Sequence, residues 1–210
     1  VMRCVPWQPV TATMIEHIPG LLFNPIRQWQ KLEPLSGRAT NLLYVFVMAV
    51  IPALAWYHGT SAVGWRVGSG DVTRLTEDSA LRLVVLFYLA MVGAVVVIGY
   101  FIHWMAASYG ARSTIPRGIT IAGLTATPLF LAGAIGVMPL LSIALPLGIL
   151  ALGWSLWLLY TGIPIVMHVP RDRGFVFASA VVAVCMVILI AMMCLSVILW
   201  DMGFAPEYTH

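Results

Sequence analysis

The chain alternates between long apolar stretches and short segments that carry most of its charged residues. A helix needs about 20 apolar residues to cross roughly 30 Å of hydrocarbon, and five stretches are near or above that length. They run from about Thr40 to Trp56, Ala80 to Met105, Ile119 to Val137, Leu140 to Met167 and Phe175 to Trp200. The pattern predicts an all-α polytopic membrane bundle of about five transmembrane helices. Only Met138 and Pro139 separate the third stretch from the fourth, so these two are expected to form a tight antiparallel hairpin.

A helix-start signal precedes the second stretch. Thr76 is followed by Glu77 and Asp78, the form of an N-cap with acidic residues in the first turn. Backbone N–H groups at that end of a helix favour negative charge. We therefore expect a helix to start at this threonine.

A shorter helix is predicted before the first stretch. Asn24-Pro25 has the form of a cap followed by proline at the first helical position. Ile26, Trp29 and Leu32 then recur at near-helical spacing, with polar residues between them. This pattern predicts an amphipathic helix that lies flat at the membrane surface, with an ordinary soluble turn as the alternative.

The composition indicates that lipid is the solvent for most of the chain. Of 210 residues, 61% are hydrophobic and 9% charged, whereas a soluble domain is about 45–50% apolar and about 25% charged. The net charge of +3 comes with no basic stripe, which argues against nucleic acid as a partner. We expect membrane lipids as partners, together with a membrane-protein partner or a second copy of the chain.

The basic residues predict an orientation in the inner (cytoplasmic) membrane. With a cytoplasmic N-terminus, one side holds eight of them and the other holds three, a bias that follows the positive-inside rule. The eight are Arg3, Arg27, Lys31, Arg38, Arg112, Arg117, Arg171 and Arg173, and the three are Arg66, Arg74 and Arg82. The chain then divides into a cytoplasmic segment (1–39) with the short helix, a five-helix domain (40–200) and a periplasmic tail (201–210).

No Asp, Glu, Lys or Arg lies in the central part of any stretch, which argues against an ion-coupled transporter. Prolines within the stretches predict kinks, and Ala132 and Gly136, four residues apart, predict a close helix contact. The candidate packing or substrate-path residues are Thr127, Pro128, Gly133, Gly136, Pro146, Tyr160, Gly162 and Pro164. Packing is the favoured interpretation, and a substrate site between broken helices is the alternative.

Chemistry beyond packing has little support in the sequence. His103 and His168 end two stretches on the same predicted side and leave open a shared metal or haem. We expect no cofactor, because neither histidine lies at mid-depth. The cysteines form no CxxC pair, which argues against zinc or disulfide sites. Without a nucleophile elbow, P-loop, dinucleotide fingerprint or zinc-protease helix, we expect no enzyme.

The order of proline, glycine and aromatic residues resembles a known family. The relevant runs are Asn24-Pro25, Val63-Gly64-Trp65, Leu86-Phe87-Tyr88, Ala126-Thr127-Pro128-Leu129-Phe130-Leu131-Ala132-Gly133 and Tyr160-Thr161-Gly162-Ile163-Pro164. They resemble the Yip (Ypt-interacting protein) domain family, in its small bacterial inner-membrane branch, over roughly residues 20 to 204. The resemblance implies five helices and a cytoplasmic N-terminus. Eukaryotic members act in vesicle trafficking with small GTPases, but the acidic motif associated with those members is missing here, so GTPase binding is not carried over.

Two functions remain as hypotheses. The first is a non-enzymatic scaffold or accessory subunit that acts through helix packing, with the kinked hairpin as its contact face. The second is a passage for a lipid or small neutral solute through that hairpin. Its polar groups would be the hydroxyls of Thr125, Thr127, Ser142, Ser155 and Thr161. A structure that shows whether these hydroxyls face a cavity or bond to their own helices would help to separate the two hypotheses.

Overall fold

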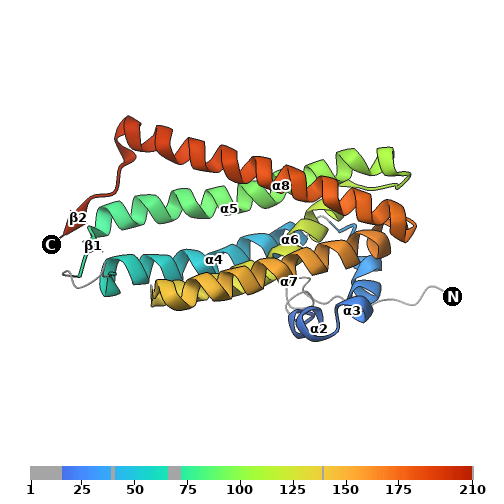
Figure 1. The fold of residues 1–210 in the computed structure, drawn as a ribbon, viewed down its shortest axis with the longest axis horizontal. Helices are drawn as coiled ribbons and strands as arrows, with labels where there is room; N and C mark the ends of the chain where they lie inside the picture. The colour runs from blue at the N-terminus through green and yellow to red at the C-terminus, as the bar shows by residue number, and fades with distance from the viewer. Residues whose placement is uncertain (1–15, 39–40, 66–71, 139, 210) are drawn as a thin grey trace.

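The computed structural model describes residues 16–38, 41–65, 72–138 and 140–209. Five helices in it are long and apolar enough to cross a membrane, which confirms the predicted all-α bundle. They are α4 (Leu42–His58), α5 (Glu77–Ala106), α6 (Ile115–Ala132), α7 (Leu141–Met167) and α8 (Arg171–Leu199). All five run along the long axis of the molecule (Figure 1). The third and fourth, α6 and α7, pack against each other as the predicted antiparallel hairpin.

Short helical turns extend four of the five spans. A π-helical turn, η3 (Gly59–Val63), continues α4, and η6 (Trp200–Phe204) does the same for α8. The 3-10 turns η4 (Ala107–Tyr109) and η5 (Gly133–Val137) continue α5 and α6.

The two ends of the bundle carry different small elements. At one end lie α2 (Ile18–Phe23), α3 (Pro25–Leu32) and the 3-10 turn η1 (Glu33–Leu35), as Figure 1 shows for the two helices. At the other end, β1 (Arg74–Leu75) pairs antiparallel with β2 (Tyr208–Thr209). The two-residue strands were not predicted, because a segment so short has no alternating pattern to detect. They tie the segment after α8 to the segment before α5.

Three helices begin earlier than their apolar stretches, at Glu77, Ile115 and Arg171. Two of these starts are capped: the Thr76 hydroxyl accepts a hydrogen bond from the Ser79 N–H at 3.3 Å, and the Thr114 hydroxyl accepts one from the Arg117 N–H at 3.4 Å. The cap at Thr76 confirms the predicted helix start. The apolar stretches start later than the helices because a change in polarity marks the edge of the hydrocarbon and not the end of the helix.

The third span, made of α6 and η5, is the centre of the bundle. In its most apolar window 61% of the residues are buried, against 6% in the span of α8. Helices α4, α5 and α7 all pack against α6. The interior of the protein is therefore built around the helix with the most glycine, threonine and proline, and α8 is the most peripheral span.

Candidate functional site

The short helix α3 confirms the predicted start after Asn24, with Pro25 at its first position, although the Asn24 side chain makes no capping hydrogen bond. Most of its apolar face is buried against the rest of the protein. Trp29 has none of its surface exposed, and Leu32 is also fully buried, whereas Ile26 is half exposed. A Cβ atom added to Gly162 on α7 would lie 2.6 Å from Cε2 of Trp29. The indole ring therefore rests on the backbone of α7, and α3 is docked on the bundle.

The run from Tyr160 to Pro164 joins α7 to two other helices. The Tyr160 and Ser179 hydroxyls are hydrogen-bonded at 2.9 Å, which links α7 to α8. Two residues on, Gly162 receives the Trp29 ring of α3. Two residues further, the Pro164 ring packs on Gly174 of α8, where an added Cβ would lie 2.6 Å from Cγ of the proline. Residues four apart share one side of an α-helix and the residue between them lies on another, so Tyr160 and Pro164 meet α8 while Gly162 meets α3.

Gly133 and Gly136 bind η5 closely to α4. An added Cβ at Gly133 would lie 2.6 Å from Cβ of Pro52, and one at Gly136 would lie 2.8 Å from Cδ1 of Trp56. The expected pairing of Ala132 with Gly136 is thus corrected to Gly133 with Gly136. The helix tightens to a 3-10 turn at Gly133, and with about three residues per turn positions i and i+3 share one side.

The tightest of the glycine contacts joins α5 to α6 and was not predicted. An added Cβ at Gly118 would overlap the carbonyl oxygen of Gly99, and one at Gly99 would lie 2.5 Å from Cα of Ile119. Both glycines are buried. A glycine in an apolar stretch marks a possible close approach, but it does not say which helix approaches.

Thr127 lies in a buried polar contact between α6 and α4. Its hydroxyl is 2.7 Å from the Tyr44 hydroxyl and donates a 3.3 Å hydrogen bond to the Gly123 carbonyl, so the tyrosine is the donor between the two. Pro128, the next residue, is also buried. This pair links α4 to the central helix in the same region as the contact of Val45 with Gly123.

Replacing Tyr44 with Phe is expected to lower the free energy of unfolding by about 1 kcal/mol, the usual net value of one hydrogen bond. Thr127→Val should cost more, about 1–3 kcal/mol, because it leaves the tyrosine hydroxyl buried without an acceptor. The double variant should recover part of that loss. Thermal unfolding in detergent measures all three, with Thr161→Val as a control because that hydroxyl bonds only within its own helix. Equal losses in Thr127→Val and Thr161→Val would contradict this assignment.

The hydroxyls proposed for a passage do not line one path in the described part of the chain. Thr125 donates to Ile121 and Ala122, and Thr161 donates to Trp157 and Leu158, all carbonyls of their own helices. Ser142 is exposed, and the buried Ser155 hydroxyl has no partner among the described residues.

Pro146 is exposed and lies apart from the other candidate residues. A Cβ atom added at Gly148 or Gly153, further along the same helix, would meet no neighbouring segment within 4 Å. The hairpin therefore has a packed end near Gly162 and an open outer face along the first half of α7, so the eight candidates do not form one site.

The end of the bundle near α3 also holds a small charged cluster. One carboxylate oxygen of Glu33 lies 3.7 Å from Arg117 and 3.7 Å from Nε2 of His168. Nearby, the buried Asn41 amide donates to the Thr120 hydroxyl at 2.8 Å. Three or more His, Cys, Asp or Glu side chains do not gather at any point of the described ranges. These contacts connect η1 to the ends of α6 and α7.

Comparison with known proteins identifies the family. The Yip1 domain model matches residues 20–192, from α2 into α8. The inner membrane protein YohC of Escherichia coli strain K12 is 35% identical over 194 residues, which cover 90% of this chain and 98% of that protein. The protein of the same name from E. coli O6:H1 matches with the same identity and coverage. No solved structure matches the chain. With five apolar spans in one helical bundle, the chain belongs to the Yip1 domain family and is a multi-pass inner-membrane protein.

Proposed function

We propose that this chain is a non-enzymatic scaffold or accessory subunit of the inner membrane that acts by helix packing. The observation that carries the proposal is where most of the candidate packing residues lie: Gly133, Gly136, Gly162 and Pro164 all contact other helices. Thr127, too, bonds to a neighbouring helix. Residues of this kind, engaged in contacts between helices, favour a structural role over a reaction or a polar path.

The open outer face of the hairpin is the contact face that we propose for a partner. It is the first half of α7, from Ser142 to Gly153. Leu145 and Ile149 are more than half exposed there, and Gly148 has open space around it. In a bilayer, small residues on such a face let another helix approach closely, and packing drives the association. A membrane-protein partner or a second copy of this chain fits these requirements.

Purification of the full chain in mild detergent, followed by mass spectrometry, tests the proposal. We expect a defined co-purifying membrane protein or a homo-oligomer. Gly148→Leu should lower its recovery about tenfold or more, because one overpacked side chain costs about 1–3 kcal/mol. Gly93→Leu on α5 is the matched control, since that glycine also meets nothing within 4 Å. A strictly monomeric chain with no co-purifying protein would count decisively against a scaffold.

We further propose that the N-terminus is cytoplasmic and the C-terminus periplasmic. Arg27, Lys31 and Arg38 are exposed at the end of the bundle that carries α3, and the positive-inside rule assigns such residues to the cytoplasm. Alkaline phosphatase fused after the last residue should be active, and a green fluorescent protein fused there should be dark. The reverse result would invert the orientation.

A further inference from the structure

The last helix leaves the bundle after its first three turns. The buried residues of α8 are Gly174, Phe177, Ala178 and Val181, and none follows Val181. The first half is held by Pro164 on Gly174 and by Tyr109 stacked on Phe177, with ring centroids 4.8 Å apart. Beyond that point α8 and α5 draw apart toward the end that carries β1 and β2 (Figure 1).

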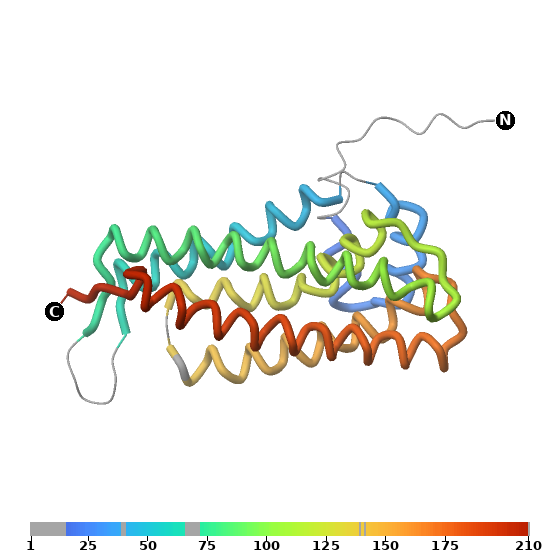
Figure 2. The backbone as a smooth tube through the Cα atoms, turned by 90° about the horizontal axis from the view of Figure 1, so that it is seen from above, coloured from blue at the N-terminus to red at the C-terminus, as the bar shows by residue number. Residues whose placement is uncertain are grey.

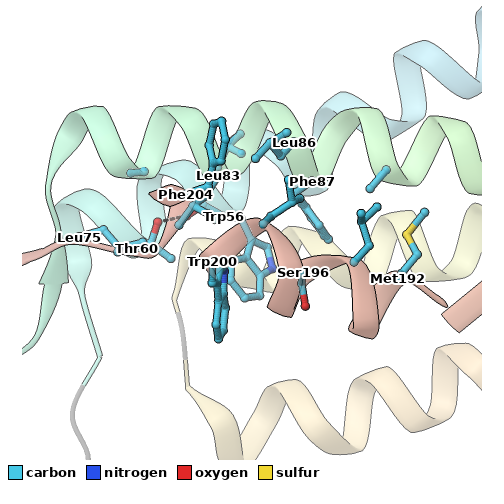
Figure 3. Close-up of a pocket in the computed structure, with 15 residues that line it drawn as sticks. Trp56, Thr60, Leu75, Leu83, Leu86, Phe87, Met192, Ser196, Trp200 and Phe204 are labelled. Carbon is cyan, nitrogen blue, oxygen red and sulfur yellow. Dashed lines mark hydrogen bonds between the residues drawn. The ribbon is translucent and has the colours of Figure 1, made fainter. Parts of the chain in front are cut away.

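A cavity of about 300 Å³ occupies the wedge between α5, the second half of α8 and the end of α4. Trp56, Leu83, Phe87, Ala90, Leu195 and Trp200 are among the residues that line it (Figure 3). Trp56 and Trp200 are each 50% exposed, so the cavity opens at the surface of the bundle as a groove. We call it the α5–α8 groove.

The groove has no free hydroxyl along its described wall. Thr60 donates to the Trp56 carbonyl at 2.8 Å, and Ser196 donates to the Met193 carbonyl at 2.8 Å. The other side chains that line the groove are apolar, apart from the two indole N–H groups near its mouth. An occupant with polar groups would lose hydrogen bonds to water here without replacing them. The chemistry of the wall therefore fits hydrocarbon.

The groove holds about 300 Å³, a space that a segment of one flexible hydrocarbon chain can enter. An unfilled gap of this kind would forfeit the dispersion contacts of both walls, and acyl chains surround it in the bilayer.

The charges at this end select the headgroup. Among the described residues at this end, the acids are Glu77, Asp78, Asp201 and Glu207 and the arginines are Arg74 and Arg82; all six are exposed. Glu77 and Asp78 lie in the first turn of α5, just before the groove. Asp201 directly follows Trp200. The excess of negative charge repels an anionic headgroup and attracts an ammonium group. Indole rings at the membrane interface favour contact with the ester region of a lipid.

We propose that the α5–α8 groove binds one acyl chain of a zwitterionic phospholipid, with its ammonium headgroup at the acidic rim. The lipid completes the packing between α5 and α8 where the protein's own side chains do not meet. The site lies apart from the outer face of α7, so it stands or falls independently of the scaffold.

The test is native mass spectrometry of the full chain from nanodiscs that contain equal amounts of phosphatidylethanolamine and phosphatidylglycerol. We expect one retained phospholipid, predominantly phosphatidylethanolamine. Ala90→Phe should lower occupancy about tenfold, because excluding two methylene groups already costs roughly that factor in affinity. Ser196→Phe fills the groove from α8 instead. If both variants lose the lipid, misfolding of Ala90→Phe alone cannot explain the loss. Ala191→Phe, at an exposed position of α8, should leave occupancy unchanged.

Four results would overturn the proposal. The first is a wild-type chain that retains no phospholipid. The second is equal retention by the wild type and both groove-filling variants, which would place any bound lipid elsewhere. The third is preferential retention of phosphatidylglycerol, which would contradict the selection by the acidic rim. A co-purified protein that is lost only from the groove-filling variants would assign the groove to a partner helix instead.

Discussion

Replacing Gly118 with alanine is expected to lower the free energy of unfolding by about 3 kcal/mol or more, the upper part of the range for overpacking. The new Cβ would overlap the carbonyl oxygen of Gly99. Backbone atoms of two packed helices cannot rotate away as a side chain can, so α5 and α6 would have to separate. At about 2–4 °C per kcal/mol for a chain of this length, the midpoint of thermal unfolding in detergent should fall by roughly 6–12 °C.

Gly93 supplies the matched control for this change. It lies on α5, as Gly99 does, but nothing approaches within 4 Å of an added Cβ. Gly93→Ala should be neutral or slightly stabilising, because alanine loses less backbone entropy than glycine when a helix forms. If Gly118→Ala and Gly93→Ala unfold at the same temperature, the close crossing of α5 and α6 is not a principal stabilising contact of the bundle.

Replacing Trp29 with alanine is expected to release α3 from α7 while the five spans stay folded. The ring is completely buried, and deleting a buried Trp side chain costs about 3–5 kcal/mol. Arg27 and Lys31 are already exposed, but trypsin needs the backbone around them to be unfolded. Where opening is in fast equilibrium, the cleavage rate follows the open population. We therefore expect cleavage in this segment to accelerate about 100-fold or more.

Two further variants separate docking from general destabilisation. Trp104→Ala removes an indole that is 64% exposed, so it should leave the cleavage rate near the wild-type value. Gly162→Leu places a side chain where the Trp29 ring lies and should reproduce the effect of Trp29→Ala from the opposite helix. Unchanged proteolysis in both Trp29→Ala and Gly162→Leu would show that other contacts hold α3.

Several local features could be predicted because each depends on nearby residues. The Thr76 cap needs only an amide three residues on, and the helix after Asn24-Pro25 follows from its proline and its spacing. The partners of those helices could not be predicted in the same way. An amphipathic face indicates that α3 covers something apolar, and both a lipid surface and the glycine of α7 satisfy that condition.

The glycines illustrate why the rest of the site was less accessible. Gly136 was expected to pair with Ala132 because an α-helix brings residues four apart together, but the 3-10 geometry of η5 pairs it with Gly133. Gly99, as a glycine in an apolar stretch, indicated only that some helix could approach closely; which backbone meets it depends on contacts that are distant in the chain. Nothing in the sequence indicated that Gly148 and Gly153 face open space, as they do in the structure.

The order of apolar and charged residues is enough to predict a five-span helical membrane bundle with no Asp, Glu, Lys or Arg in the central part of any span. Hydrophobic length and charge depletion act residue by residue against the bilayer, so they can be read along the chain without knowing any contact. Three features appear only in the folded protein: which glycines receive which side chains, the central place of α6, and the divergence of α8 that leaves a groove. Those outcomes depend on how whole helix surfaces fit together, and small surfaces on several helices allow more than one arrangement until all five are packed.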